Sequence, residues 1–343
     1  VAAQPGVWLV FRRDEDEQDF LASRQRSGPL RPAWQRPVGP RPVPPTRLRA
    51  EHAPKAPREP KRARIDPWLE HADLAEALWQ ACLAFGRLPD AAEWPEMAAV
   101  TAELGRPETA LRRLRTERDQ AELDNARAER ISDLTVYLAL QLFERRKSFA
   151  HLSERLQRDV RAFWGSLGNA TDAGRVLLFS SGKPESIATA CELAAGQGLG
   201  WLVRDDQQRV DALHVRSAQL GALPPLLRVY VGCAEKLYGD LQAADVVKIH
   251  ARSPKVTAQI YDDFEGRLVP DLLERVKIDL RRAEIDFFGY GTEKFPAQPL
   301  WLKSRLMGEG DDGFAEQVAF DRRVEALGLF DFSGFGPARA EVL

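Results

Sequence analysis

Apolar residues recur at helical spacing through the middle of the chain. Over residues 67–85 they fall near every 3.6 positions, and the pattern ends at Gly86. A helix is therefore predicted there, with Asp66 as its N-cap and Pro67 at its first position. A second, shorter element is expected at residues 94–104.

A long helical stretch is expected to begin at Pro107. Its first half, residues 112–130, is dense in charge, whereas residues 131–143 are almost wholly apolar. A helix with this change of character passes from solvent into the core, because a surface that is apolar on all sides has to be buried. The charged half is interpreted as a solvated face and not as a binding surface.

An amphipathic block at residues 152–163 ends at Gly165 and predicts a further helix. Arg158 and Arg161 stand close to Asp159 within this block. Opposite charges on the exposed side of a helix commonly form surface ion pairs, which contribute little to stability. Surface pairing is therefore expected here.

The sequence SSGKP at residues 180–184 superficially resembles a phosphate-binding loop. The Walker pattern requires Gly, four residues and then Gly-Lys-Ser/Thr. Here no glycine stands at the required spacing, and Pro184 replaces the hydroxyl residue. We expect Ser180 or Ser181 to cap a helix over residues 184–195 instead.

A glycine-rich run, GQGLG at residues 196–200, follows that helix and is interpreted as a helix end and a turn. An acidic residue followed by Gly-x-Gly occurs nowhere in the sequence. A loop that would bind a nucleotide or S-adenosylmethionine between a strand and a helix is therefore not expected within this chain. No cofactor is predicted for it.

Short segments of alternating or β-branched residues dominate part of the last third of the chain. These segments are 245–250, 255–261, 275–280 and 284–288. They predict a small antiparallel β-meander. The expected fold class is α+β, with a mainly helical middle region followed by an α+β module that contains the meander.

One face of the predicted meander carries polar side chains. Residues two apart on a strand point the same way, so Lys248 lies with His250, and Lys277 lies with Asp279. Lys255 could share this face. A partly basic face of this kind suits the phosphates of a nucleic acid. The alternative interpretation is the solvent face of a half-covered sheet.

The net charge of −2 conceals a strongly basic tract. Residues 28–66 contain ten Arg and Lys against three acidic residues, a net of +7, so the rest of the chain carries −9. The ten prolines of this tract prevent a regular ladder of backbone hydrogen bonds, and the tract has few apolar residues to bury. A disordered or polyproline-like arm is therefore expected. Its basic residues are Arg31, Arg36, Arg41, Arg47, Arg49, Lys55, Arg58, Lys61, Arg62 and Arg64.

The basic arm has two interpretations. It is a soluble spacer between domains, or its cations contact nucleic-acid phosphates by a sequence-independent, salt-sensitive attraction. The expected domains are a terminal strand and helix (1–27), a disordered Pro/Arg-rich basic linker (28–66), a helical domain (67–170) and an α+β domain with the antiparallel meander (171–343).

Composition excludes several protein classes. The chain is 44% hydrophobic and 29% charged, its apolar runs are too short to span a membrane, and its first residues lack the features of a signal peptide. A cytoplasmic protein is expected. Cys82, Cys191 and Cys233 are far apart and lack CxxC spacing, so buried thiols are expected instead of disulfides or a zinc site.

Two catalytic alternatives are open. A metal-dependent nuclease or hydrolase would gather several carboxylates around a metal ion. The candidates in one section of the chain are Asp262, Asp263, Asp279 and Asp286. A nucleophile pairing would instead join Cys233 to His250 or His214.

The opening of the chain and several later segments resemble one bacterial family. The segments are GVWLVFR at 6–12, QDFLASR at 18–24, DLTVYLAL at 133–140, LQRDVRAFWG at 156–165, LPPLLRVY at 223–230, GCA at 232–234 and VKIH at 247–250. Their order along residues 1–307 is similar to that of the DNA phosphorothioation-associated methyltransferases. The sequence departs from this family where Val269-Pro270 replaces a His-Pro pair, and its Pro-rich tract is longer than usual.

The resemblance implies that residues 1–27 are the last strand and helix of a methyltransferase domain. A lone strand after Gly6 cannot bury itself, so we expect its partner strands to belong to a part that precedes Val1. The complete protein would use S-adenosylmethionine and act on DNA in a modification, restriction or defence system. This chain would then be an accessory region that binds DNA or a protein partner and is not catalytic alone. A purely structural protein-interaction module is the remaining alternative.

Overall fold

The computed structural model describes residues 2–4, 7–8, 67–144, 152–330, 332, 336–337 and 339–342. It divides the chain into two compact units, Val1–Arg64 and Ile65–Leu343. In the first unit, strand β1 (Ala2–Gln4) pairs antiparallel with β2 (Val7–Trp8). The strand after Gly6 thus has one partner within the chain, which corrects the expectation that all its partners are absent. The predicted linker at 28–66, with its capping residue Asp66, lies outside the described residues.

Short helical elements form the first part of the second unit. They are α2 (Pro67–Glu70), α3 (Ala72–Phe85), α4 (Met97–Ala99), the π-helical turn η2 (Val100–Leu104) and α5 (Pro107–Glu117). Leu78 and Trp79 of α3 belong to one apolar cluster with Leu114 of α5. Gly86 ends α3 as the sequence predicted, with a φ of 64° that glycine adopts without strain.

Helix α6 (Gln120–Phe143) begins separately from α5. The long helix predicted from Pro107 is interrupted because Arg118 is extended, and the Asp119 side chain accepts a hydrogen bond from a backbone amide in the first turn of α6. The side chains in the apolar second half of α6 are buried or half-buried, apart from Asp133 and Tyr137, which agrees with the predicted passage into the core. Its buried residues there are Leu134, Val136, Leu138 and Ala139.

Three further helices follow α6. They are α7 (Glu154–Trp164), α8 (Leu167–Ser180) and α9 (Pro184–Gly196). The domain boundary predicted after residue 170 falls within α8. The glycine-rich run ends α9 as predicted: the Leu199 amide donates to the Ala194 carbonyl, and Gly198 has a φ of 76°.

The serine hydroxyls before α9 do not cap it, which corrects the sequence prediction. Ser180 donates to the Val176 carbonyl, and Ser181 donates to the Leu178 carbonyl. Both bonds return to the preceding helix α8, because a serine near a helix C-terminus finds the carbonyls of the last turn within reach. Lys183 occupies the N-cap position of α9 without a side-chain hydrogen bond.

Asp159 of α7 is fully buried, which corrects the prediction of surface pairing. The guanidinium of Arg87, just after α3, lies 2.7 Å from one carboxylate oxygen, and that of Arg130 in α6 lies 2.7 Å from the other. Arg87 also pairs with Glu93 at 2.8 Å. The carboxylate therefore joins segments that are far apart in the sequence.

Six strands form one antiparallel sheet in which each strand pairs with the next one in the sequence. They are β3 (Trp201–Arg204), β4 (Val210–Arg216), β5 (Val246–His250), β6 (Lys255–Tyr261), β7 (Leu272–Asp279) and β8 (Glu284–Gly289). The last four are the predicted meander, and β3 and β4 extend it. The fold class is α+β, with a helical region before the sheet, as predicted.

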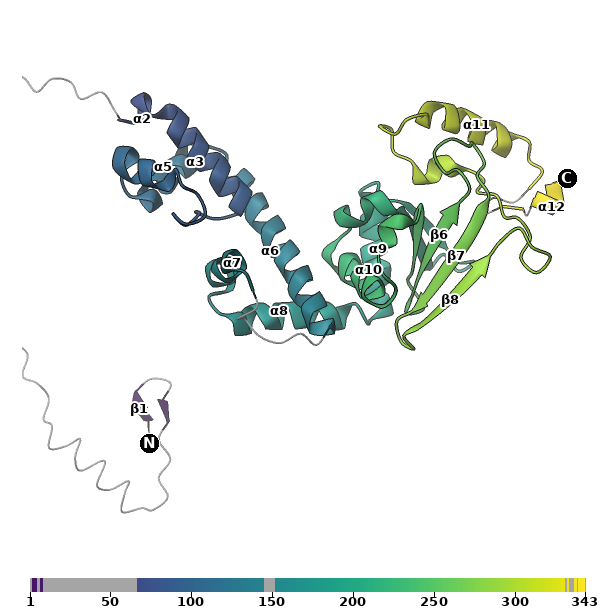
Figure 1. Cartoon of the computed structure of the whole chain (residues 1–343), viewed down its shortest axis with the longest axis horizontal. Coiled ribbons are helices and arrows are strands. Elements are labelled where there is room, and N and C mark those ends of the chain that lie inside the picture. Colours follow the sequence, from purple (N-terminus) through teal and green to yellow (C-terminus); the bar gives the residue numbers. More distant parts are fainter. Residues whose placement is uncertain are drawn as a thin grey trace, which may run out of the picture. The chain divides into compact units, whose positions relative to one another are not determined.

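Helices α9 and α10 (Pro225–Tyr238) cover one face of the sheet (Figure 1). Leu213 and Ile249 from the strands form one core cluster with Ile187 of α9 and Leu227 of α10. Alternation along the strands explains this arrangement, because every second side chain points toward the helices. Val136 and Ala139 of α6 pack with Val229 and Cys233 of α10 in a neighbouring cluster.

The chain after β8 covers one end of the opposite sheet face. There Leu300 and Leu306 pack with Val246 of β5 and Tyr261 of β6. The remaining elements are η4 (Ser217–Ala222), η5 (Leu241–Ala243), η6 (Lys303–Leu306), α11 (Phe314–Ala326) and α12 (Arg339–Val342). Among the described residues, no helix combines the length and the apolar character needed to cross a membrane.

Candidate nucleic-acid interface

The sheet face that α9 and α10 leave uncovered carries the predicted basic residues. Cross-strand register places Lys248 of β5 opposite Thr257 of β6, and Thr257 opposite Lys277 of β7. His250 lies two residues beyond Lys248 on the same face. The sheet thus brings Lys248, His250 and Lys277 together. The predicted arm residues lie outside the described part of the chain: Arg31, Arg36, Arg41, Arg47, Arg49, Arg58, Lys61, Arg62 and Arg64.

Arg275 also belongs to this face, although the sequence pattern alone did not single it out. It lies two residues before Lys277 on β7 and opposite Gln259 of β6. The alternation that places Lys277 with Asp279 applies equally to Arg275. The alternation along the strand was therefore enough to place Arg275 on this face from the sequence.

The cations on this face lie close enough to influence one another. Burial lowers the pKa of Lys248, and the positive charges of Arg275 and Lys277 lower it further. The carboxylate of Asp211, 3.9 Å from the Lys248 ammonium nitrogen, has the opposite effect. Lys255 lies 3.6 Å from Asp279, which offsets its charge. An approaching anion would relieve the repulsion among Lys248, Arg275 and Lys277.

His250 is uncharged at neutral pH, in contrast to the basic role that its position suggested. Burial lowers its pKa to about 3, and the charges of Lys248 and Lys277 add to the shift. Its Nε2 lies 3.0 Å from the hydroxyl oxygen of Thr257. As a contact to phosphate, His250 would act through hydrogen bonding and not through charge.

The nucleophile pairing considered for Cys233 does not form. Cys233 lies on α10 and packs in an apolar cluster with Val136 and Val229. His214 and His250 lie on the sheet face that points away from α10, so the sheet separates them from the thiol. Burial raises the pKa of Cys233 to about 12, which keeps it protonated.

All three cysteines are buried, as predicted. Burial raises the pKa of Cys82 and of Cys191 to about 12 as well. Because the thiolate is the reactive form of cysteine, these thiols are chemically inert at neutral pH. They contribute to the core as small apolar side chains.

The four carboxylates of the hydrolase alternative do not converge on a metal site. Asp262 and Asp263 accept hydrogen bonds from backbone amides of the loop after β6, and Asp279 accepts two from the turn after β7. Asp286 lies opposite Lys277 on β8. Within the described ranges, no group of three or more His, Cys, Asp or Glu side chains is placed to hold a metal ion.

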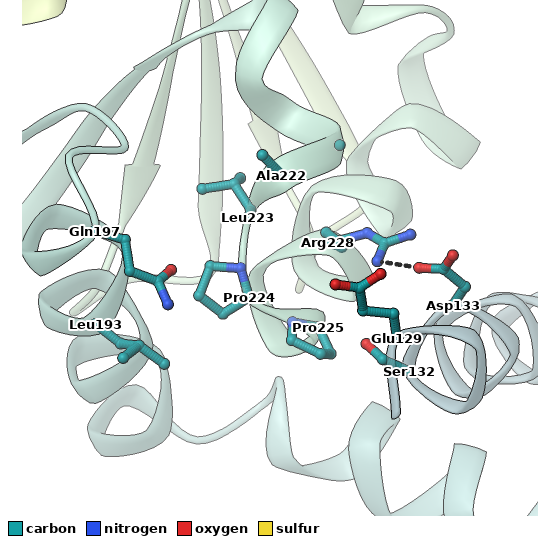
Figure 2. Close-up of a pocket in the computed structure, with 11 residues that line it drawn as sticks. Glu129, Ser132, Asp133, Leu193, Gln197, Ala222, Leu223, Pro224, Pro225 and Arg228 are labelled. Atoms are coloured by element: carbon teal, nitrogen blue, oxygen red, sulfur yellow. Dashed lines mark hydrogen bonds and ion pairs between the residues drawn. The ribbon is translucent and has the colours of Figure 1, made fainter. Parts of the chain in front are cut away.

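A cavity of about 410 Å³ lies among α6, α9, η4 and the start of α10. Figure 2 shows Glu129 and Asp133 of α6 at this cavity, with Pro224 and Pro225 lining another part of it. Arg228 lies 2.7 Å from Asp133, so its charge is balanced. The carboxylates make the cavity unsuited to phosphate, and it does not extend the basic sheet face.

Comparison with known proteins identifies no relative: no protein-family model, curated protein or solved structure matches the chain. The resemblance to the phosphorothioation-associated methyltransferases therefore stays a prediction. The chemistry of the site follows from the side chains of the sheet face themselves.

Proposed function

We propose that this chain is an accessory region that binds the phosphate backbone of DNA and has no catalytic activity of its own. The observation that carries the proposal is the placement of Lys248 and Lys277, both half-buried, in one cross-strand row on the sheet face opposite α9 and α10. Arg275 adds positive charge in the neighbouring row. Cations that face phosphates from a sheet supply attraction without reading the base sequence.

The basic arm supplies most of the attraction in this proposal. The chain outside residues 28–66 carries a net charge of −9, which opposes association with DNA, whereas the arm carries +7. On the sheet face, Asp211 offsets part of the charge of Lys248. The sheet would therefore orient the DNA while the arm provides affinity.

The wider setting of the proposal comes from the sequence resemblance. A complete protein of that family would act in the cytoplasm, bind S-adenosylmethionine in its methyltransferase domain, and modify DNA together with protein partners. Within this setting the chain would hold the DNA close to the catalytic domain.

The test measures affinity for fluorescently labelled duplex DNA as a function of salt concentration. Replacing the ten Arg and Lys of the arm by Gln should nearly abolish binding. The double change Lys248→Gln with Lys277→Gln should have a smaller effect and reduce the slope of log affinity against log salt by up to about 2, about one for each phosphate that is no longer neutralised. Lys183→Gln, at an exposed position before α9, serves as the matched control and should leave the slope unchanged.

The effect of each charge change should be equal on unrelated DNA sequences, because phosphates carry no sequence information. Absence of DNA binding at low salt would overturn the proposal. Binding that persists after the arm is neutralised would show that the arm is a spacer. Absence of DNA binding would favour the alternative of a protein-interaction module.

A further inference from the structure

Strand β8 forms one edge of the six-stranded sheet (Figure 1). Its six residues pair with β7 without an irregularity of register, and among the described residues no strand pairs with its other side. A row of backbone amides and carbonyls therefore lies along this side without a neighbouring strand. Such a row is the template to which an extended peptide can add as a further strand.

The opposite edge of the sheet is less suited to strand addition. Strand β3 is only four residues long, its register with β4 shifts between Val203 and Arg204, and α9 packs against it. Short strands, irregular register and covering helices all hinder the pairing of a sheet edge with another chain. Strand β8 contains neither proline nor a bulge, so its outer side keeps the regular geometry that pairing requires.

Alternation determines which backbone groups of β8 point outward. Just beyond β8, the Tyr290 amide donates to the Leu273 carbonyl at 2.9 Å. In an antiparallel pair every second residue turns its amide and carbonyl toward the neighbouring strand, so the even-numbered residues of β8 bond to β7. Ile285 and Phe287 therefore turn their amides and carbonyls to the outer side.

Phe287 gives this edge an apolar surface. Its side chain is 62% exposed although it lies on the sheet face that α10 covers, opposite the core residue Val276. The ring centre of Tyr238 in α10 lies 6.2 Å from that of Phe287. An apolar side chain on an added strand would cover the exposed part of the Phe287 ring.

The other face of the same edge is acidic. Glu284 and Asp286 alternate with the apolar residues of β8 and are exposed. Arg282 lies 3.7 Å from Glu284, whereas Asp286 has no ion-pair partner among the described residues. Lys277 is the cross-strand neighbour of Asp286, so a basic residue on an added strand would continue an alternation of charge across the sheet.

The two acids also decide between two kinds of partner. Antiparallel pairing with β8 of a second copy would bring Glu284 and Asp286 close to the same residues of that copy. Like charges on neighbouring strands repel, so self-pairing is disfavoured. A basic strand has the complementary charge.

We propose that β8 binds an extended segment of a protein partner as a seventh strand of the sheet. The segment alternates basic residues, which face Glu284 and Asp286, with apolar residues, which pack on Phe287. Its length is about six residues, to match β8. The proposal goes beyond DNA binding, because it uses the backbone of the edge strand and a protein ligand.

The test measures fluorescence anisotropy of a labelled synthetic peptide in which Lys and Val alternate, titrated with the full chain. Two control peptides have Lys and Val in separate blocks, or Glu in place of Lys. The alternating Lys/Val peptide should bind at least about tenfold more tightly than either control. Only this peptide presents a basic face and an apolar face when it is extended.

Reversing the charge of the edge should reverse the choice of peptide. The double change Glu284→Lys with Asp286→Lys should bind the Glu/Val peptide more tightly than the Lys/Val peptide. This comparison of two peptides on one variant is unaffected by a uniform loss of folded protein. Asp124→Lys with Asp206→Lys, the same change of charge at exposed positions on other segments, should keep the original preference.

Two variants of one residue test the role of the backbone. Phe287→Ala keeps the outward amide and loses the ring, so it should weaken peptide binding about three- to tenfold. Phe287→Pro also removes the amide, which does not serve β7, and should reduce binding below detection. Equal affinities of the two variants would show that the peptide does not pair with β8 and would overturn the proposal.

Absence of binding by the Lys/Val peptide at millimolar concentration would overturn the proposal, and so would equal binding of the alternating and block peptides. Sedimentation of the chain as a dimer that Phe287→Pro converts to a monomer would identify a second copy as the occupant instead. None of these results would alter the salt dependence of binding to duplex DNA, so the two proposals fail separately.

Discussion

Burial sets the charge of the histidines on the sheet face opposite α9 and α10. His214 is fully buried, and its pKa lies well below the usual value because burial disfavours the charged ring and the charge of Lys248 adds to this effect. Burial lowers the pKa of His250 in the same way, to about 3. Protonation of either ring would place another positive charge beside Lys248.

Stability should consequently fall in mild acid. The folded pKa of His250 lies below the unfolded value of about 6.5, so the unfolded chain binds the extra proton between these two values. The free energy of unfolding should therefore decrease as pH falls from about 6.5 toward 4. In His250→Asn this decrease should be shallower, as measured by urea unfolding at a series of pH values. Identical pH slopes for the two proteins would contradict the assignment.

Helices α6 and α7 are joined to the end of α3 by one buried carboxylate. The Asp159 carboxylate pairs with both Arg87 and Arg130. Among the described residues, Arg87 also pairs with Glu93, whereas Arg130 has no second carboxylate partner. A buried ion pair is costly to break on one side, because the charge that remains has lost its partner. This cluster should therefore matter more than the surface pairs.

Asp159→Asn should lower the free energy of unfolding by about 3 kcal/mol, because two guanidinium groups would lose the only charge that they share. Urea unfolding measures the change. The matched control is Asp172→Asn, whose carboxylate pairs with Arg175 on the surface of α8 and should contribute less than about 1 kcal/mol. Equal effects of the two changes would show that the buried cluster is not stabilising.

The start of β3 depends on a glycine. Gly200 has a φ of 87°, and a Cβ at this position would lie 2.2 Å from the backbone oxygen of His214 on the paired strand. Gly200→Ala should therefore cost at least about 2 kcal/mol of unfolding free energy. Gly196→Ala, at the end of α9 with open space around it, should change stability by less than about 1 kcal/mol. A thermal unfolding comparison of the two variants tests this, and a tolerated Gly200→Ala would contradict it.

The second unit contains the apolar clusters of the described structure, all of whose members follow residue 65. A chain of residues 65–343 should therefore unfold at the same urea concentration as the full chain.

Limited trypsin digestion should cut first between Arg31 and Arg64, because that tract is rich in proline and poor in apolar residues, and leave a fragment that begins near Pro67. A tract that resists trypsin while the rest is digested would contradict the linker prediction.

Features that depend on neighbours along the chain could be predicted from the amino-acid sequence. Alternation over residues 245–288 located four strands and placed Lys248 with His250, and Lys277 with Asp279. The helical period located α3 and the second half of α6. Gly86 marked a helix end because its positive φ is a local property. Backbone conformation and periodicity are set within a few residues, so a single sequence carries them.

Contacts between distant groups required the folded chain. The burial of Asp159 depends on Arg87, 72 residues away, and nothing in the neighbouring residues indicated that this carboxylate would leave the surface. The small cavity between β6 and β7 likewise requires residues 298 and 299 to fold back beside Gln259 and Arg275. The charge of His250 depends on burial and on Lys277 from another strand. Such contacts leave no periodic trace, because they arise when chain closure and core packing bring separate segments together.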